Sequence, residues 1–259
     1  MRLVVFASGS TGNCALVQGA GRSVLIDAGI SAKRIRLALE AEGIEPKSLD
    51  GIFITHEHAD HISGLTVLCK RCPIPVFAPE TVADALRRTL PEAAPYVRTL
   101  RQEQPLSLGC MTVTPFPTPH DTPESAGYRL EADGTTLTVA TDTGCITDAM
   151  LRYFAGADMA LIEANHDIAM LRNGPYPAYL KRRILSDKGH LSNAECTWLA
   201  AVLAQRGTGQ VVIGHISKHN NIPGLARRTI ARALEGTGAQ LYVAPELGRL
   251  DVEVEPCFV

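Results

Sequence analysis

Short apolar runs recur along the chain, and stretches with an apolar residue every three or four positions lie between some of them. Runs of four to seven residues rich in Val, Ile, Leu and Phe are typical of buried strands, and the longer periodic stretches are typical of amphipathic helices. The predicted strands are 3–7, 23–27, 51–55, 75–78, 111–116, 127–131, 137–141, 159–164, 210–215, 240–244 and 249–254. The predicted helices are 31–42, 80–90, 147–155, 192–206 and 223–235.

Two of these helices carry recognisable end signals. Ser192 followed by Glu195 is a capping-box pattern, and Gly207 follows the last periodic residue of the same helix. Pro223 stands where the first turn of a helix tolerates proline. The stretch 164–191, rich in Pro, Gly, Arg and Lys, has no clear period. We expect it to be a long, irregular functional loop.

The order of the predicted elements favours an α/β fold built from two layered sheets with helices outside. Strands occur both in uninterrupted groups and in alternation with helices, which fits this arrangement better than a doubly wound parallel sheet. No repeat, low-complexity segment or linker divides the chain, so we expect a single domain over 1–259. No apolar run reaches 18 residues and the first residues do not resemble a signal peptide, so we expect a cytoplasmic protein that does not interact with membranes.

The cysteines and the overall charge argue against a disulfide framework, a zinc ribbon and a generally basic nucleic-acid-binding surface. The seven cysteines are odd in number and scattered, which predicts free thiols, Cys257 among them. Cys69 and Cys72 form a C-x-x-C pair without a second pair at zinc-ribbon spacing, which favours plain packing. The net charge is −2, so any affinity for nucleic acid must come from a local basic patch.

The run THEHADH at 55–61 places three imidazoles and two carboxylates directly after an apolar strand. Unpaired ionisable groups are costly to bury, so they must be solvated, paired or bound to metal. His56 and His58 share one side of an extended chain and can bind one ion together. Asp60 and His61 follow where the chain turns and can face a second ion. Imidazole and carboxylate suit zinc and similar metals.

Three further candidate ligands occupy equivalent places in the sequence. His120, Asp142 and His215 each follow a predicted strand and precede a loop. A single histidine at a strand end is usually structural, but ligands from several strand ends can converge at one edge of a sheet.

The signature H-x-H-x-D-H at 56–61 resembles that of the metallo-β-lactamase superfamily, and the spacing to the later candidates agrees. The resemblance implies an αββα four-layer sandwich of two mixed sheets with helices outside. It implies one metal held by His56, His58 and His120, another held by Asp60, His61 and His215, and Asp142 as the bridge. Asp27 matches a supporting residue near the site. Asp60 would be both a ligand and a catalytic residue.

Two divalent ions would hold a water molecule, lower its pKa toward about 7 and polarise the electrophile. Zinc is the first expectation and manganese the alternative, because mixed His/Asp ligation accepts both. This chemistry serves lactams, thioesters and phosphodiesters alike, so the substrate must be inferred from other residues.

ALIEANHD at 160–167 followed by SDKGHLSNAE at 186–195 is similar to a ribonuclease Z pattern. By that resemblance Glu163 orients His190, and His190 protonates the leaving oxygen of a phosphodiester. A carboxylate partner favours a protonated imidazole. Read from the residues alone, His190 is equally well a loop histidine beside a helix N-cap.

Across nearly the whole chain the resemblance is to the YycJ/WalJ group of bacterial metallo-hydrolases, carried by ASGSTGNCALV, LIDAGIS, THEHADHISGL, TDTG, the long string from 163 to 193, and HISKHNN. This group lacks the β-CASP domain, and no such insertion is expected here. The resemblance implies a 5′-to-3′ exodeoxyribonuclease acting on the ends of duplex DNA, associated with mismatch repair.

The predicted substrate-binding residues surround these motifs. Residues 168–190 carry five basic side chains against one acidic, with two tyrosines between them, which is typical of a nucleic-acid-binding patch. The loop 8–13 is small and polar but lacks the Gly-Lys-Ser/Thr of a Walker motif, so no nucleotide cofactor is expected. The candidates are Ser10, Asn13, His166, Arg172, Lys181, Arg182, Lys218 and Asn220.

Other functions remain open on the sequence. The same site could hydrolyse a small cyclic phosphodiester, and a thioester or lactam hydrolase would not need the pair Glu163–His190. A non-catalytic binding module is disfavoured because all seven candidate ligands are present.

Overall fold

The computed structural model describes residues 1–256, and its centre is formed by two mixed sheets. The first has the strand order β14-β1-β2-β3-β4-β5-β6, and the second has the order β13-β12-β11-β10-β9-β8-β7. In each sheet a part with antiparallel pairing continues into a part with parallel pairing, β3 to β6 in the first and β10 to β13 in the second. The strands of the first sheet are β1 (Arg2–Ala7), β2 (Cys14–Gly19), β3 (Arg22–Ile26), β4 (Gly51–Phe53), β5 (Val76–Pro79), β6 (Val97–Leu100) and β14 (Leu250–Glu253). Those of the second are β7 (Leu106–Leu108), β8 (Met111–Pro117), β9 (Ala126–Ala132), β10 (Thr135–Ala140), β11 (Met159–Glu163), β12 (Gln210–Gly214) and β13 (Gln240–Val243).

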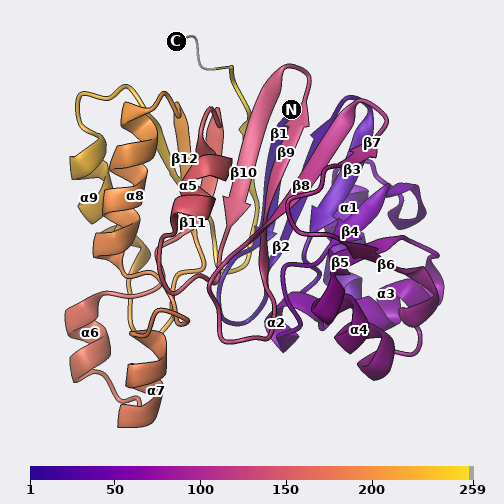
Figure 1. Ribbon diagram of the computed structural model, residues 1–259, viewed down its shortest axis with the longest axis horizontal. Helices are drawn as coiled ribbons and strands as arrows, with labels where there is room; N and C mark the ends of the chain where they lie inside the picture. Colours follow the sequence, from indigo (N-terminus) through magenta and orange to yellow (C-terminus); the bar gives the residue numbers. More distant parts are fainter. Residues whose placement is uncertain (257–259) are drawn as a thin grey trace.

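Helices cover the outer face of each sheet (Figure 1). The first sheet is covered by α1 (Ala32–Ala41), α3 (Leu65–Arg71) and α4 (Glu80–Thr89), and the second by α5 (Asp148–Phe154), α8 (Asn193–Gln205) and α9 (Pro223–Leu234). Three short helices lie along the lower edge in Figure 1: α2 (Ala59–Ile62), α6 (Ile168–Asn173) and α7 (Ala178–Ile184). Single 3-10 turns form η1 (Pro46–Ser48) and η2 (Ala94–Tyr96).

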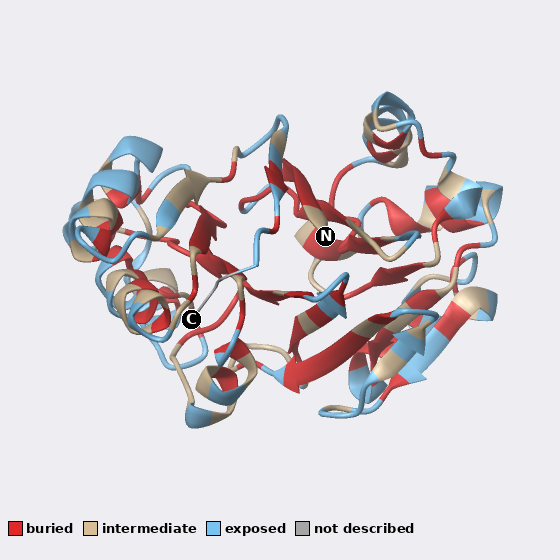
Figure 2. Ribbon diagram, turned by 90° about the horizontal axis from the view of Figure 1, so that it is seen from above, coloured by how far each residue is buried: buried red, intermediate tan, exposed pale blue. Residues whose placement is uncertain are grey.

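The apolar residues form three layers, which explains why the strands are apolar on both faces. Strand β1 is typical: Leu3 and Val5 point into the central layer between the sheets, and Val4 and Phe6 point into the layer beneath the helices. A third cluster lies between the second sheet and its helices. Figure 2 shows the buried ribbons in the middle and the exposed helix faces outside. The predicted four-layer αββα sandwich is confirmed, and residues 1–256 contain no β-CASP insertion.

The predicted helices agree with the structure to within two residues at each end. Ser192 caps α8 through both bonds of the capping box, and Gly207 follows the helix with a left-handed backbone. The prediction of an irregular loop over 164–191 is wrong in part, because α6 and α7 lie within it. Both helices are only six or seven residues long, too short to show a clear period. Strands β2, β6 and β7 were also missed.

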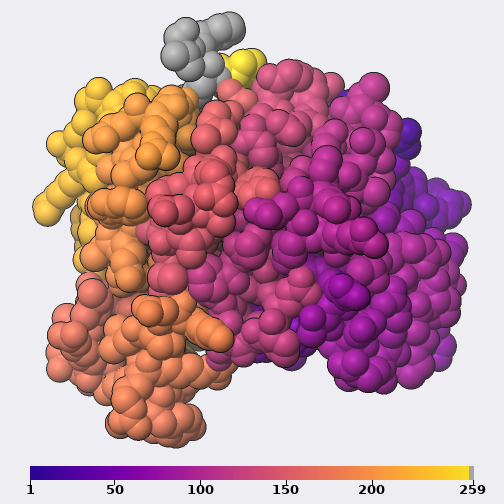
Figure 3. Space-filling view, viewed as in Figure 1, coloured from indigo at the N-terminus to yellow at the C-terminus, as the bar shows by residue number. Residues whose placement is uncertain are grey.

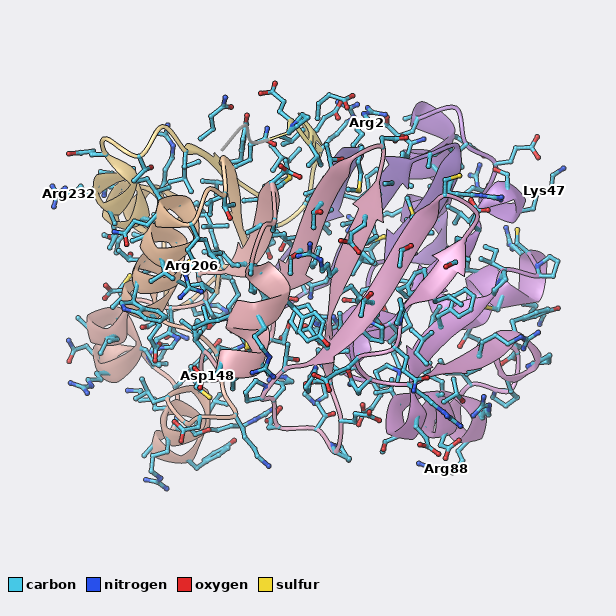
Figure 4. All side chains as sticks on the ribbon, turned by 45° about the horizontal axis from the view of Figure 1, so that its top comes forward. Arg2, Lys47, Arg88, Asp148, Arg206 and Arg232 are labelled. Atoms are coloured by element: carbon cyan, nitrogen blue, oxygen red, sulfur yellow. The ribbon has the colours of Figure 1, made fainter. Side chains whose placement is uncertain are left out.

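Charged side chains point outward around the sandwich, as Figure 4 shows for Arg2, Lys47, Arg88, Asp148, Arg206 and Arg232. The cysteines at 69 and 72 are free and belong to the helix-side packing, as predicted, whereas Cys257 lies outside the described residues. No helix within residues 1–256 combines the length and the apolar character needed to cross a bilayer.

Candidate metal centre

The segments that follow β4, β8, β10 and β12 converge at one edge of the sandwich. In chain order these segments carry the predicted ligands of the run 55–61, His120, Asp142 and His215. Groups of these side chains place one ligand atom each within 4.8 Å of the others. Residues separated by more than 150 positions in the sequence therefore form one cluster of imidazoles and carboxylates.

The first group is formed by His56, His58 and His120. Nε2 of His56 lies 3.0 Å from Nδ1 of His58, and the ring of His120 packs against both of the others. His56 and His120 are buried, whereas about a third of the His58 side chain is exposed. Three imidazoles aimed at one point are a ligand set suited to a transition metal.

The second group is formed by Asp60, His61 and His215. Asp60 and His61 lie on the single turn of α2, and Nε2 of His215 is 3.8 Å from Oδ2 of Asp60. Asp142 lies between the two groups. Its carboxylate oxygens are 3.4 Å from Nε2 of His61, 3.4 Å from Nε2 of His215 and 3.9 Å from Nε2 of His120.

Four of the five imidazoles are oriented by a partner on the ring nitrogen that faces away from the cluster. Nδ1 of His56 lies 3.0 Å from Oγ1 of Thr55, and Nδ1 of His61 lies 2.8 Å from the Asp27 carboxylate. Nδ1 of His120 lies 3.2 Å from the Gly189 carbonyl oxygen, and Nδ1 of His215 lies 3.0 Å from the Glu163 carboxylate. A fixed Nδ1 leaves Nε2 free to bind, and such partners are the usual support of metal-binding histidines. Asp27, predicted as a supporting residue, also accepts from the Thr55 backbone.

Three site residues have a left-handed backbone although none is glycine. Asp27, Asp142 and His215 have φ angles of 60°, 55° and 50°, and each follows closely on a strand. This conformation is uncommon for such residues and costs of the order of 1 kcal/mol or more each. It turns the chain sharply at the sheet edge, so the side chain points back toward the cluster.

The electrostatics keep the carboxylates of the cluster ionised. Burial by itself raises the pKa of Asp142, but His215 and His61 outweigh it and hold the pKa below its usual value. The pKa of Asp60 is lowered in the same way, chiefly by His215. Burial opposes charge on His61, yet Asp27 and Asp142 raise its pKa to about 9. The ionised carboxylates are ready ligands, and metal binding would displace protons from imidazoles.

Two buried atoms in the cluster have no hydrogen-bond partner within residues 1–256: Oδ2 of Asp142 and Nε2 of His215. Buried polar groups are normally paired, and an unpaired carboxylate oxygen beside an unpaired imidazole nitrogen is costly. A divalent cation would satisfy both. The orphaned atoms, the outward support of the rings and the N/O donor set therefore fit divalent metal ions.

Glu163 and His190 also lie together beside this cluster. Oε2 of Glu163 is 3.1 Å from Nδ1 of His190, and the backbone amides of Thr143 and Leu191 donate to Oε1. Burial raises the pKa of Glu163, but His190 and His215 reverse that effect and hold its pKa below the usual range. The side chain of His190 is 20% exposed, so the ring is held from beneath and remains accessible.

The predicted substrate-binding residues divide into two sets. Asn13, His166 and Asn220 are buried, and Asn13 donates to the Gly9 carbonyl and contacts Nε2 of His61 at 3.1 Å. Their placement favours support of the site over contact with a substrate. Nζ of Lys181 donates to a carbonyl at the end of α6, which ties the two short helices together. The exposed members are Ser10, Arg172, Arg182 and Lys218.

We refer to residues 168–184, which contain α6 and α7, as the arm. In Figure 3 the arm stands out at the lower left as a separate projection. It is joined to the site by an ion pair between Arg183 and Asp121, and Oδ1 of Asp121 lies 3.3 Å from Nε2 of His120. Sequence reasoning missed the part played by Asp121, although its position directly after His120 was a usable signal.

The fold and the cluster define the class of protein. A family model described as a beta-lactamase superfamily domain matches residues 22–216, more than half of the chain. The chain resembles the zinc-bound crystal structure of PqqB from Methylobacterium extorquens with a TM-score of 0.72 at 19% identity, covering 97% of this chain and all of that one. The chain therefore belongs to the metallo-β-lactamase superfamily, and it is a metal-dependent hydrolase.

Two curated relatives refine this assignment. Exodeoxyribonuclease YycJ of Bacillus anthracis is 35% identical over 250 residues, which cover 95% of this chain and 94% of the relative. Exodeoxyribonuclease WalJ of Streptococcus pneumoniae is 36% identical over 238 residues, covering 89% and 87%. Within the superfamily, the chain belongs to the YycJ/WalJ family.

Proposed function

We propose that this protein is a dinuclear metal-dependent exodeoxyribonuclease that degrades duplex DNA from 5′ ends. The observation that carries the proposal is the pair Glu163–His190 beside the two ligand groups. A thioester releases a thiolate, which leaves without such an additional proton donor, whereas an alkoxide leaving from phosphorus is aided by one. The names of the two relatives, both exodeoxyribonucleases, support DNA as the substrate. A role in DNA repair in the cytoplasm is part of this proposal and rests on the family resemblance of the sequence.

In this proposal His56, His58 and His120 would hold one metal, and Asp60, His61 and His215 would hold the other. Asp142, whose carboxylate lies near His61, His120 and His215, would be a further ligand. A pair of divalent ions, zinc or manganese, supplies an activated water and neutralises charge on the phosphate. Glu163 holds the His190 ring through Nδ1, so a proton on Nε2 can be given to the leaving oxygen. Asp60 is a ligand whose ionised carboxylate also orients the reacting groups.

The arm would bind the duplex. Arg172 and Arg182 are exposed, and 66% of Tyr179 on α7 is accessible, an unusual exposure for a large aromatic side chain. Cations bind phosphates and an exposed ring stacks on bases, so the two together favour a nucleic acid. Ser10 lines the cavity beside His190, and Lys218 lines a second cavity that shares Ser217 with it.

The test is a metal-dependent degradation assay on end-labelled duplex DNA, with bound metal measured in parallel. We expect degradation from the 5′ end and an affinity that falls steeply with salt, because phosphate contacts release counterions. A small cyclic phosphodiester is the second candidate, favoured by the compact 180 Å³ cavity beside His190. Hydrolysis of a cyclic phosphate with little dependence on salt, and no degradation of duplex DNA, would select it.

A further inference from the structure

A cavity of about 180 Å³ lies between His190 and the arm. Its lining includes Ser10, Asn165 and Ser217 on one side and Tyr176 and Arg183 on the other, and none of the seven candidate metal ligands lines it. The cavity thus shares the wall formed by His190 with the metal centre but is a separate space.

The chemistry of the lining favours an anion. Hydroxyl and guanidinium groups supply its donors, since the Asn165 amide already donates to the His215 carbonyl at 3.1 Å. The one carboxylate, Asp121, is paired with Arg183 and turned toward His120. Among the described residues Arg183 uses only Nε in that pair, so its terminal nitrogens are free to donate. A guanidinium with hydroxyl donors around it is a common phosphate-binding arrangement.

The cavity is held in shape by the fold. Asn165 and Ser217 are buried, the Ser217 amide donates to the Asn165 carbonyl at 2.8 Å, and the Asn220 amide donates to the Ser217 hydroxyl at 3.3 Å. On the arm side, the Tyr176 ring packs edge-on against His219 at 5.9 Å. The donors are therefore preorganised, which reduces the entropy lost on binding.

The position of His190 decides which part of a substrate reaches this cavity. As the proton donor of the proposed function, His190 lies beside the leaving oxygen, so the cavity lies on the leaving-group side of the scissile bond. Water adds its hydroxyl to phosphorus, the bond from phosphorus to the 3′-oxygen breaks, and that oxygen takes a proton from His190. The group that leaves is the terminal nucleotide, and its own phosphate is at its 5′ end.

We propose that the cavity binds the 5′-phosphate of the terminal nucleotide, with Arg183, Tyr176 and Ser217 as specificity-determining residues. This inference rests on the proposed function and adds to it a preference for phosphorylated over hydroxyl 5′ ends. It also gives a physical reason for exonucleolytic cleavage, because a strand whose 5′-phosphate occupies the cavity is bound at its end.

The test compares matched duplexes with a 5′-phosphate or a 5′-hydroxyl, using the metal-loaded protein. We expect the parent to show a KM about tenfold or more lower for the phosphorylated end, the effect of one charge-assisted contact. Anisotropy with duplexes that carry phosphorothioates at the first linkages gives the same comparison for binding, because cleavage of those ends is slow.

Four variants at three positions test the lining, and one further variant serves as a control. Arg183→Ala should remove most of the preference, and Arg183→Lys should restore part of it, since the charge remains but the fork is lost. Tyr176→Phe and Ser217→Ala keep the shape and should each reduce the preference by about threefold. Arg232→Ala removes an equivalent charge from α9, far from the site in Figure 4, and should retain the preference.

Each outcome has a definite meaning. Degradation of both duplexes with equal KM would overturn this inference and leave the proposed function standing. If Arg183→Ala weakens the KM equally for both duplexes, and Tyr176→Phe and Ser217→Ala leave the KM preference unchanged, Arg183 serves to dock the arm. That result would also overturn this inference. Absence of any DNA degradation would overturn the proposed function itself.

Discussion

Nδ1 of His190 lies 3.1 Å from Oε2 of Glu163, and the same carboxylate oxygen lies 3.0 Å from Nδ1 of His215. One buried carboxylate thus orients both a candidate metal ligand and the candidate proton donor. The backbone amides of Thr143 and Leu191 fix the second oxygen of this carboxylate. The metal centre and the proton donor are therefore held as one unit.

Replacement of His190 by alanine should separate proton donation from metal binding. We expect His190→Ala to retain its metal and to lose about 10²- to 10⁴-fold in the rate of DNA degradation, the usual contribution of a general acid. The control is bis(p-nitrophenyl) phosphate, whose leaving group needs no proton, and on which the variant should remain close to the parent. A parent-like rate on DNA would contradict the assignment.

Metal should stabilise the folded protein as well as activate it. A bound cation would satisfy the unpaired atoms of Asp142 and His215 and the clustered imidazoles. A ligand present at a free concentration of 100 times its Kd adds about 2.7 kcal/mol to the free energy of unfolding. A chelator should therefore lower the Tm, and added zinc or manganese should restore it.

His58→Ala should lower both the bound metal, measured by elemental analysis, and the response of the Tm to the chelator. His219→Ala is the matched control, because His219 is exposed and belongs to none of the candidate ligand groups. Identical melting of chelated and metal-loaded parent protein would count against a metal centre of this kind.

Gly189 directly precedes His190 and packs against the end of the arm so closely that there is no space for a side chain at this position. A Cβ atom there would lie 2.1 Å from the carbonyl oxygen of Ile184. Gly189→Ala must push the end of α7 and the His190 loop apart, so we expect a loss of about 1–3 kcal/mol in the free energy of unfolding, measured in urea. DNA degradation should slow as well.

The control for this substitution is Gly224→Ala in the first turn of α9, where a Cβ would meet only the end of the Arg228 side chain at 3.4 Å. Alanine favours a helix over glycine by about 1 kcal/mol at interior positions, so this variant should be neutral or slightly stabilising. If both variants unfold at the same urea concentration as the parent, the tight contact at Gly189 does not constrain the loop.

Glu42, which lies away from the candidate site, should make the free energy of unfolding depend on pH. Arg249 and Arg2 hold the pKa of Glu42 below its usual value, with hydrogen bonds of 2.6 Å and 2.7 Å. A lowered pKa stabilises the fold above the unfolded pKa of about 4.3, and this contribution is lost as the pH falls through the folded value. Glu42→Gln should therefore cost about 1 kcal/mol at pH 7 and less at pH 3.

Urea unfolding at the two pH values measures this difference. Glu45→Gln is the control, since its ion pair with Lys47 is about 70% exposed on both sides and contributes little. An equal effect of Glu42→Gln at both pH values would show that packing, and not charge, makes the difference.

The hydrophobic periodicity of the sequence determined most of the strands and helices that form the four layers of the sandwich. Strands such as 210–214 and helices such as 193–205 were predictable because each is long enough to show its period and is bounded by its own capping and turn residues. The arm was not predictable in this way. Helices α6 and α7 are each short and are stabilised by contacts from other segments, including the bond from Lys181 and the ion pair of Arg183.

For the site, the sequence by itself determined which residues are candidate ligands, and the structure brings them together, because H-x-H-x-D-H is informative without its surroundings. Only the tertiary structure decided how they are used. The ring nitrogen that faces the cluster is set by Thr55, Asp27, Gly189 and Glu163, which are distant in the sequence from most of the rings they orient. The cavity beside His190 likewise exists only where the arm meets the sheet edge. Hydrogen bonds and cavities depend on distances between atoms of different segments, and a linear pattern does not contain those distances.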